Sequence, residues 1–186
     1  MYILPYALKS LGKPNLKNFA PQQITMNKNI VIADYSNKQH AKDIVFLLNY
    51  YALDPAGGGI ELSEYTQNNL VEELAKLPFA FSILCYVENI PAGLINCFTL
   101  FSTFKCKPVI NIHDLIVIKS YRQIGISQLL LKEVEKIAKQ KEACKITLEV
   151  LENNFYANKA YAKFGFVGYE LDPQYGKAVF LEKSLL

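Results

Sequence analysis

The chain has 186 residues, of which 51% are hydrophobic and 20% are charged, and its formal net charge at pH 7 is +3. This length predicts one domain with room for a short appendage, and the apolar content excludes disorder over most of the chain. The weak, evenly spread positive charge excludes the basic stripe expected of a nucleic-acid-binding protein. No uncharged apolar stretch approaches the roughly 18 residues that a membrane-spanning helix needs, so we expect no membrane segment.

The cysteines bear on metal binding and on the cellular compartment. The four positions are Cys85, Cys97, Cys106 and Cys144. They form no C-x-x-C pair, and neither histidine lies at ligand spacing from them, so we expect no metal site. Three of the four lie in strand-like apolar runs, which predicts buried, reduced thiols and a cytoplasmic location. The N-terminus has no basic segment followed by an apolar core, so we expect no signal peptide.

Residues 1–28 differ from the rest of the chain. They contain three prolines, several asparagines and lysines, and no hydrophobic periodicity. Chain ends are commonly poorly ordered unless they are docked on a folded part. We therefore predict an N-terminal extension over residues 1–28 and a single folded domain over residues 29–186.

Hydrophobic periodicity and turn residues predict the elements of the first half of the domain. Ile44 and Leu48 belong to an apolar stripe with three- and four-residue steps, which is typical of a helix. Ser63 can cap a second helix, which Pro78 follows. The predicted elements are a strand at 29–34, helices at 37–52 and 63–77, and a hairpin of strands at 79–87 and 92–101 with its turn at 88–91.

The second half alternates strands and helices. The predicted elements are strands at 109–118 and 145–151, helices at 125–140 and 153–164, and two final strands at 166–171 and 178–183. The connection between the strands at 109–118 and 145–151 is long enough for a parallel crossover through a helix. The element order therefore predicts a mixed α/β sheet protein rather than a doubly wound parallel one.

The turn before the predicted helix at 125–140 suits an anion. The first N–H groups of a helix have no partner within it and carry the positive end of the dipole. Gly125 has no Cβ, so an anion can approach the backbone closely, and Arg122 adds positive charge. A plain strand-to-helix turn explains this segment equally well by itself. The G-x-G-x-x-G and G-x-x-x-x-G-K-[ST] phosphate motifs do not occur.

Asp114 interrupts the apolar face of the preceding strand. The isoleucines at 110, 112, 116 and 118 share its parity. A carboxylate within a core face is costly without partners. A β-bulge near Asp114–Leu115 would resolve the conflict and free backbone groups to bind an extended ligand. The other interpretation is that Asp114 hydrogen-bonds a neighbouring loop.

Two motifs of the sequence resemble those of the GNAT superfamily of acetyl-CoA-dependent N-acetyltransferases. The strand HDLIV followed by YRQIGIS matches the [QR]-x-x-G-x-[GAS] pyrophosphate loop of that family. Residues 154–166, NFYANKAYAKFGF, match its N-x-x-A-x-x-x-Y-x-x-x-G-F pattern. Ser127 stands where many members have glycine, and we expect little effect. The resemblance covers residues 29–186 and implies a GNAT-like fold, a central mixed and mostly antiparallel sheet with splayed strands and about four helices.

The resemblance also implies cofactor-binding roles for individual residues. Backbone groups of Leu115, Ile116 and Val117 would hold the pantetheine arm of acetyl-CoA, and Asn154 would contact it. The pyrophosphate would lie beside Arg122 on the backbone amides of Gln123, Ile124, Gly125, Ile126, Ser127 and Gln128. Tyr161 would lie near the thioester sulfur. From the pattern alone, Tyr161 is equally a core residue of an amphipathic helix and Asn154 a helix cap.

Acetyl transfer to an amine defines what the catalytic residues must do. The amine must lose a proton, the developing oxyanion needs donors, and the leaving thiolate gains from a proton that Tyr161 would supply. We expect direct attack in a ternary complex, because no cysteine has an obvious activating partner. His113 and Asp114 are the candidate bases, because both lie near the reaction centre if the strand bulges. Glu149 on the next strand is a weaker candidate.

The acceptor and the partners are the least determined features. Acidic residues at 54, 61 and 64 and the segments 101–104 and 169–172 are candidate walls of an acceptor cleft. We expect a primary amine of a small molecule rather than a protein, because no extended acidic groove for a peptide is evident. A peptide acetyltransferase, a catalytically silent acetyl-CoA sensor and an unrelated nucleotide-binding α/β protein are the alternatives. The 12 tyrosines and 11 phenylalanines are compatible with a homodimer.

Overall fold

A computed structural model describes residues 26–169, 172, 174, 176 and 179–185. Most of the predicted N-terminal extension, residues 1–25, lies outside the described residues, so its role stays a prediction. No helix of the described part is long and apolar enough to cross a membrane.

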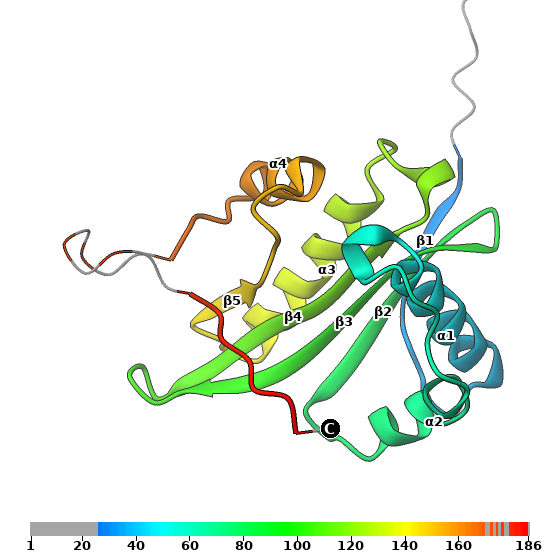
Figure 1. Cartoon of the computed structure of the whole chain (residues 1–186), viewed down its shortest axis with the longest axis horizontal. Helices are drawn as coiled ribbons and strands as arrows, with labels where there is room; N and C mark the ends of the chain where they lie inside the picture. The colour runs from blue at the N-terminus through cyan, green and yellow to red at the C-terminus, as the bar shows by residue number, and fades with distance from the viewer. Residues whose placement is uncertain (1–25, 170–171, 173, 175, 177–178, 186) are drawn as a thin grey trace, which may run out of the picture.

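Five strands form one sheet in the order β1-β2-β3-β4-β5 (Figure 1). The strands are β1 (Lys28–Ile32), β2 (Ala80–Val87), β3 (Ile90–Ser102), β4 (Lys107–Val117) and β5 (Lys145–Leu148). The first three pairings are antiparallel, and β4 pairs with β5 in parallel. This confirms the expected mixed, mostly antiparallel sheet.

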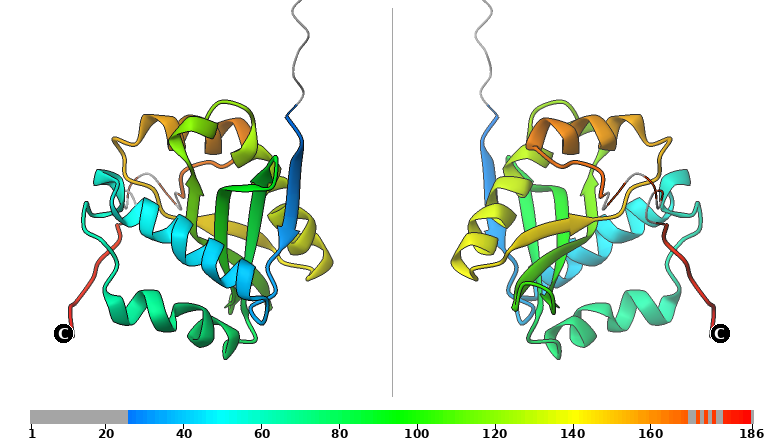
Figure 2. Two further views of the ribbon diagram at one scale, coloured as in Figure 1. Left: turned by 90° about the vertical axis from the view of Figure 1, so that its right-hand side faces the viewer. Right: turned by 90° about the vertical axis from the view of Figure 1, so that its left-hand side faces the viewer.

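Four α-helices of the described residues flank this sheet. They are α1 (Lys38–Ala52), α2 (Glu64–Ala75), α3 (Ile126–Gln140) and α4 (Phe155–Phe164). The side chains of Asn37 and Ser63 cap α1 and α2 by accepting backbone N–H groups, as the residue types predict. Figure 2 shows α1 and α2 on one side of the sheet and α3 on the other.

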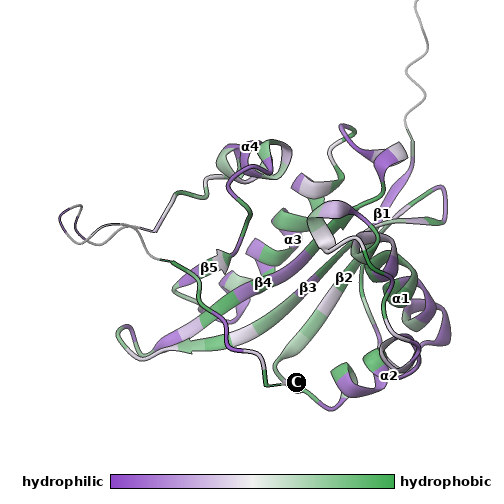
Figure 3. Cartoon of the chain, in the orientation of Figure 1, coloured by the Kyte–Doolittle hydropathy of each residue, from purple (hydrophilic) through white to green (hydrophobic). Residues whose placement is uncertain are grey.

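The alternation of side chains along the strands creates two apolar cores. Ile95 and Ile110 face α3 and pack with residues such as Leu130. Leu84 and Leu94 face the opposite side and pack with α1. The strands are therefore largely hydrophobic on both faces, as the hydropathy colouring of the central strands shows (Figure 3). A central strand covered on both sides needs such a pattern.

A β-bulge in β4 explains the position of Asp114. Asn96 of β3 pairs with Asp114, while the next β3 residue, Cys97, pairs with Ile112, so His113 is the extra residue. Ile112 belongs to the core facing α3, whereas Ile116 belongs to the core facing α1. The bulge lies one residue earlier than expected. It places the Asp114 side chain on the face of the sheet opposite to the one that its parity with Ile110 and Ile112 predicts.

Two of the predicted strands are not seen among the described residues. Residues 166–169 and 179–183 form no strand, although the segments 166–171 and 178–183 were expected to pair, and residues 170, 171 and 178 lie outside the described part. Val167 and Leu181 are 90% and 83% exposed. An apolar alternating run becomes a strand only when a partner is available, and the four-residue β5 offers little to pair with.

Close contact between the sheet and α3 gives a stability prediction. A Cβ on Gly93 would lie 2.8 Å from Cγ2 of Ile126 and 3.2 Å from Cδ1 of Leu130, both on α3. Gly93→Ala should therefore lower the free energy of unfolding by roughly 1–3 kcal/mol through overpacking, measured by urea denaturation. The control is Gly168→Ala, because a Cβ there meets nothing within 4 Å. Equal stability of the two variants would contradict this packing.

Candidate active site

The candidate site begins where β4 separates from β5. Their parallel ladder joins Val109 to Lys145 and ends at Ile112 and Leu148. β4 continues to Val117, whereas the chain after Leu148 leaves the sheet. Residues 113–117 therefore have a neighbour strand on the β3 side alone within the described part, as the separating ribbons in Figure 1 show.

The direction of the β4 backbone identifies the groups that face this gap. The Ile118 amide donates to the Ala92 carbonyl at 3.0 Å, so these two residues form a hydrogen-bonded pair. Bonded and non-bonded pairs alternate along an antiparallel ladder, so Ile116 directs its backbone groups at β3. Leu115 and Val117 direct their N–H and C=O groups toward the gap. Two of the three backbone positions expected to hold a pantetheine arm thus face the gap, and Ile116 faces β3 instead.

The N-terminus of α3 lies after β4 and a short helical turn, η3 (Lys119–Tyr121). Gly125 precedes the helix in the left-handed region, with φ 90°, and no side chain caps the helix. The first intrahelical bond runs from the Leu129 amide to the Gly125 carbonyl, so the amides of residues 126–128 have no acceptor within the helix. A Cβ on Gly125 would meet nothing within 4 Å. Open space and amides without a helical acceptor together suit an anion.

Basic side chains add positive charge at this turn. Lys28 of β1 donates from Nζ to the Ile124 carbonyl at 2.7 Å. Arg122 donates from Nε to the Val117 carbonyl at 3.1 Å, and its Nη2 lies 3.7 Å from Oδ2 of Asp54. The predicted loop residues 122–128 are thus held between β4, β1 and the loop after α1. The ion pair is exposed, so it orients Arg122 more than it stabilises the fold.

The α4 residues of the second motif lie beside this turn. Asn154 caps α4 by accepting the Ala157 amide at Oδ1, at 3.2 Å, which leaves its Nδ2 group for other contacts. Gln128 donates from Nε2 to the Ala160 carbonyl at 3.0 Å and so ties α4 to the start of α3. The two sequence motifs therefore meet in space.

Tyr161 lies on α4 against the core that faces α3, with its ring edge-on to Phe166 at 5.7 Å. Burial first, and then the nearby Tyr51, raise the pKa of Tyr161 from 10.0 to about 12. The Tyr161 hydroxyl therefore stays protonated at neutral pH and can donate a proton.

Asp114 and His113 have different surroundings. Asp114 is partly buried and accepts a hydrogen bond at Oδ2 from Nδ2 of Asn96, at 2.9 Å. His113 is exposed and lies edge-on to Phe98 at 5.5 Å. Burial first, and then the charge of Asp114, raise the pKa of Tyr51. Tyr51 therefore lies near Asp114, while its hydroxyl donates to the Ala56 carbonyl at 3.3 Å.

The thiols offer no alternative nucleophile in the core. Burial raises the pKa of Cys85 to about 11 and that of Cys97 higher still, so both are protonated at neutral pH. Cys106 and Cys144 are exposed, contrary to the expectation that three of the four thiols are buried. They lie in turns next to strands, where apolar neighbours in the sequence do not ensure that a side chain is buried.

The acidic residues expected at an acceptor cleft each have a different environment. Asp54 accepts the Ala56 amide at 3.0 Å as the cap of a short helical turn, η2 (Pro55–Gly57), and faces Arg122. Glu61 accepts from Asn49 at 3.1 Å between α1 and α2, and Glu64 is exposed. These three carboxylates therefore do not point to a common cationic ligand.

The other expected cleft segments lie away from the gap. Residues 101–104 are at the far end of the β3–β4 hairpin, where Phe104 is 98% exposed. The Tyr169 ring lies under Nζ of Lys145, at 5.2 Å, beside the start of β5. Glu149 is exposed after the end of β5. The remaining expected positions 170 and 171 lie outside the described residues.

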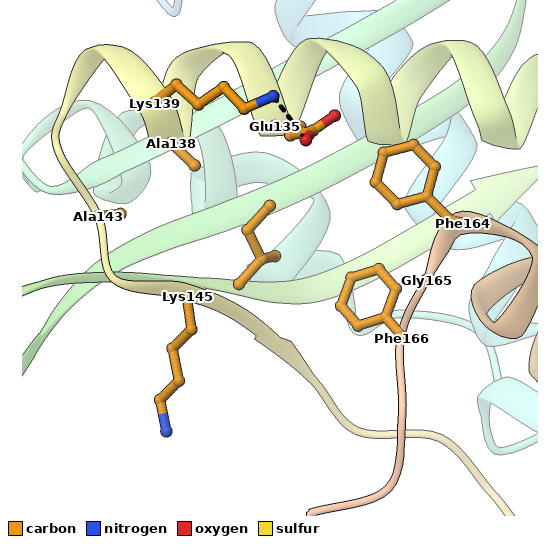
Figure 4. A pocket seen from close by; sticks show the side chains of 9 residues that line it. Glu135, Ala138, Lys139, Ala143, Lys145, Phe164, Gly165 and Phe166 are labelled. Carbon is orange, nitrogen blue, oxygen red and sulfur yellow. Dashed lines mark ion pairs between the residues drawn. The ribbon is translucent and has the colours of Figure 1, made fainter.

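Two pockets in the described part lie elsewhere. One of about 300 Å³ is lined by the C-terminal half of α3, the start of β5 and residues 164–166 (Figure 4). Its rim carries the ion pair between Lys139 and Glu135, at 2.7 Å, which the i,i+4 spacing predicts. A larger pocket, of about 590 Å³, lies between α1 and α2. Neither is lined by Asp114 or Tyr161.

Three residues of the site region were not found by sequence reasoning. Tyr51 was assigned only to the apolar stripe of its helix, and Lys28 to the extension. Asn96 is 4% exposed in the centre of β3. An amide within the apolar run of the predicted strand at 92–101 is the signal that could have found it.

A sequence model described as the acetyltransferase (GNAT) family matches residues 46–166. No curated protein sequence matches significantly.

Several solved structures share the fold. A ribosomal-protein-alanine N-acetyltransferase from Brucella melitensis biovar Abortus 2308 has a TM-score of 0.68 at 14% identity, covering 85% of this chain and 100% of that chain. An aminoglycoside acetyltransferase from an uncultured soil metagenomic sample, in complex with sisomicin, has a TM-score of 0.70 at 14% identity, with coverages of 86% and 97%. The aminoglycoside N-acetyltransferase AAC(6')-Iy in complex with CoA has a TM-score of 0.65 at 16% identity, with coverages of 85% and 95%. At these identities the likeness establishes the fold.

The raised pKa of Tyr161 predicts a pH-dependent contribution to stability. Above pH 10 the unfolded tyrosine ionises while the folded one keeps its proton, so its stabilising contribution is present below pH 10 and is lost as the pH rises toward about 12. The difference in unfolding free energy between wild type and Tyr161→Phe should therefore shrink between pH 9 and pH 11 in urea titrations. Tyr156→Phe is the control, since Tyr156 is 82% exposed. A pH-independent difference for Tyr161→Phe would contradict the assigned burial.

Proposed function

Since the chain belongs to the GNAT family of acetyltransferases, we propose that it transfers the acetyl group of acetyl-CoA to a primary amine of a small molecule. The observation that carries this proposal is the gap between β4 and β5, which lies next to an uncapped α3 N-terminus. The reaction proceeds by direct attack of the amine, without a covalent acyl-enzyme.

The residues at the gap fit acetyl-CoA, the acyl donor that this family uses. The amides of residues 126–128 have no partner within the helix, and the space in front of Gly125 is open. Both features suit a pyrophosphate, and Arg122 and Lys28 add positive charge. The outward N–H and C=O groups of Leu115 and Val117 suit the amides of an extended arm, as in strand addition. When bound, acetyl-CoA supplies an activated thioester.

Asp114 is the base that the structure supports better than His113. An amine with a pKa of about 10.4 is protonated near pH 7, so a base must remove a proton before it can attack. The Asp114 carboxylate is partly buried, accepts a hydrogen bond from Asn96, and lies near Tyr51. The same negative charge attracts the cationic form of the amine. The exposed His113 ring is held by Phe98 alone among the contacts described here.

Tyr161 is the proposed proton donor to the leaving thiolate. Its pKa of about 12 keeps it protonated, and Asn154 and Gln128 anchor α4 beside the α3 turn. A positioned acid contributes roughly 10²–10⁴-fold to a rate. A donor group of the β4 backbone at Leu115 or Val117 is available for the developing oxyanion.

Binding of acetyl-CoA can be tested without knowing the acceptor. At 100 times its Kd a ligand adds about 2.7 kcal/mol to the unfolding free energy, so a saturating amount should raise the Tm clearly. NAD and ATP should not reproduce the shift. Ser127→Glu should reduce it, because the new charge repels the pyrophosphate, whereas Gln140→Glu places the same charge at the other end of α3 and should leave the shift unchanged.

Stabilisation by NAD or ATP without stabilisation by acetyl-CoA would contradict the proposal. If acetyl-CoA raises the Tm of Ser127→Glu as much as that of wild type, the assigned phosphate site is contradicted, although acetyl-CoA remains the ligand.

Catalysis can be tested with a panel of primary amines, followed by release of free CoA thiol. The panel holds sisomicin, spermidine, tyramine and a peptide that begins with alanine. With the best acceptor, Asp114→Asn and Tyr161→Phe should each lower kcat by roughly 10²–10⁴-fold, since each removes a proton-transfer group. His113→Gln should retain kcat within about threefold.

The panel also separates the alternatives. Turnover of the peptide alone would favour a protein acetyltransferase and overturn the small-amine assignment. Binding of acetyl-CoA with no turnover of any amine would favour a catalytically silent sensor domain. Loss of kcat in His113→Gln, with Asp114→Asn unaffected, would reverse the assignment of the base.

A further inference from the structure

A chain of polar side chains crosses the sheet beneath α1 and ends on Asp114. The Tyr35 hydroxyl lies 2.9 Å from the Ser82 hydroxyl, and Ser82 donates to Oδ1 of Asn96 at 2.7 Å. Nδ2 of Asn96 then donates to Oδ2 of Asp114 at 2.9 Å. The chain runs from the turn before α1 through β2 and β3 to the bulge of β4.

The hydrogen-bonding capacity of each group sets the direction of this chain. The amide oxygen of Asn96 can only accept, so the Ser82 hydroxyl must donate to it, and the Tyr35 hydroxyl donates to Ser82 in turn. The amide nitrogen can only donate, so it faces the acceptor oxygen of Asp114. If the Asn96 amide were turned over, its oxygen would face a carboxylate oxygen. The acceptor-only carboxylate of Asp114 therefore selects the amide orientation, and the hydrogen bond from Ser82 helps to hold the amide in it.

The location of the chain is unusual for groups with a purely structural role. Ser82 is 0% exposed and Asn96 is 4% exposed, and they share their sheet face with Leu84 and Leu94. Replacing both partners of a buried hydrogen bond with apolar groups of similar shape can be nearly neutral, so stability alone gives little reason for this chain. Its end coincides with the one register shift between β3 and β4, where the gap begins.

We propose that Asn96 is a positioning residue for acetyl transfer, which holds the Asp114 carboxylate in place on the α1 face of the sheet, and that Ser82 and Tyr35 hold the Asn96 amide in turn. This inference rests on the proposed role of Asp114 as the base. Asn96 touches no substrate and acts through Asp114, so its loss should slow proton removal while leaving the acetyl-CoA site intact.

The variants form a graded series along the chain. Asn96→Leu removes the donor to Asp114, Ser82→Ala releases the amide to rotate, and Tyr35→Phe removes the outermost hydroxyl. A misplacement of about 1 Å in a reacting group can cost 10²-fold, so Asn96→Leu should lower kcat roughly 10- to 100-fold. Ser82→Ala should have a smaller effect and Tyr35→Phe the smallest. Ser82→Thr keeps a hydroxyl and should restore most of the loss.

Thr99→Val is the matched control. Thr99 lies on β3, three residues from Asn96, and its Oγ1 is buried without a hydrogen-bond partner among the described residues. Its replacement with valine removes a buried hydroxyl from the same strand and leaves the hydrogen bonds between Tyr35, Ser82, Asn96 and Asp114 unchanged. We expect wild-type kcat and an unfolding free energy that is no lower than that of wild type.

The measurements use the best acceptor of the amine panel. The KM for acetyl-CoA and the acetyl-CoA-induced Tm shift should stay at wild-type values in Asn96→Leu while kcat falls, which a merely structural loss would not produce. In an Asp114→Asn background, Asn96→Leu should have no further effect on kcat, because it acts through Asp114.

The outcomes separate this inference from the proposed function. If Asp114→Asn retains full kcat, or no amine of the panel turns over, the catalytic role of Asp114 fails and the inference with it. If Asp114→Asn is impaired but Asn96→Leu and Ser82→Ala keep wild-type kcat, only the positioning role is overturned. Additive losses in the double variant would overturn it as well. Should Asn96→Leu fail to fold, Ser82→Ala and its threonine counterpart decide the question.

Discussion

The rest of the site depends on the extra residue that β4 carries at His113. Without it, β4 would keep Ile110 and Asp114 on one face, and the carboxylate would lie in the apolar core beneath α3. The bulge rotates the strand by one position, so that residues 114 and 116 face α1 while residues 115 and 117 face α3. The ladder to β5 ends at Ile112, directly before the extra residue. One inserted residue thus accompanies both the placement of the carboxylate and the opening of the sheet.

The candidate site combines backbone groups that would bind the cofactor with side chains that would react. The binding groups are mostly main chain, namely the outward edge of β4 and the amides at the start of α3, so many sequences could supply them. The two proposed reacting groups are side chains of different elements, Asp114 of β4 and Tyr161 of α4. Burial raises the pKa of Tyr161, while Asp114 receives a hydrogen bond suited to a carboxylate.

Local signals were sufficient wherever the determining interactions are local. The caps at Asn37, Ser63 and Asn154 and the left-handed Gly125 and Gly165 could be anticipated from residue type, because capping bonds span three or four residues. The final strands were expected from their apolar alternation and are not formed in the described residues. Strand pairing requires a partner that is distant in sequence, and alternation does not specify one.

The sequence by itself determined the element order from β1 to α4 and the two motifs that indicated the family, and it offered a bulge near Asp114 as one of two interpretations. Only the tertiary structure decided that Ile116 faces β3, that Arg122 meets Asp54 and Val117, and that Asn96 connects Ser82 to Asp114. The longest of these separations is that between Arg122 and Asp54, which lie 68 positions apart in the sequence. Periodicity describes which face a residue occupies on its own element, whereas such contacts depend on how the elements are placed against one another.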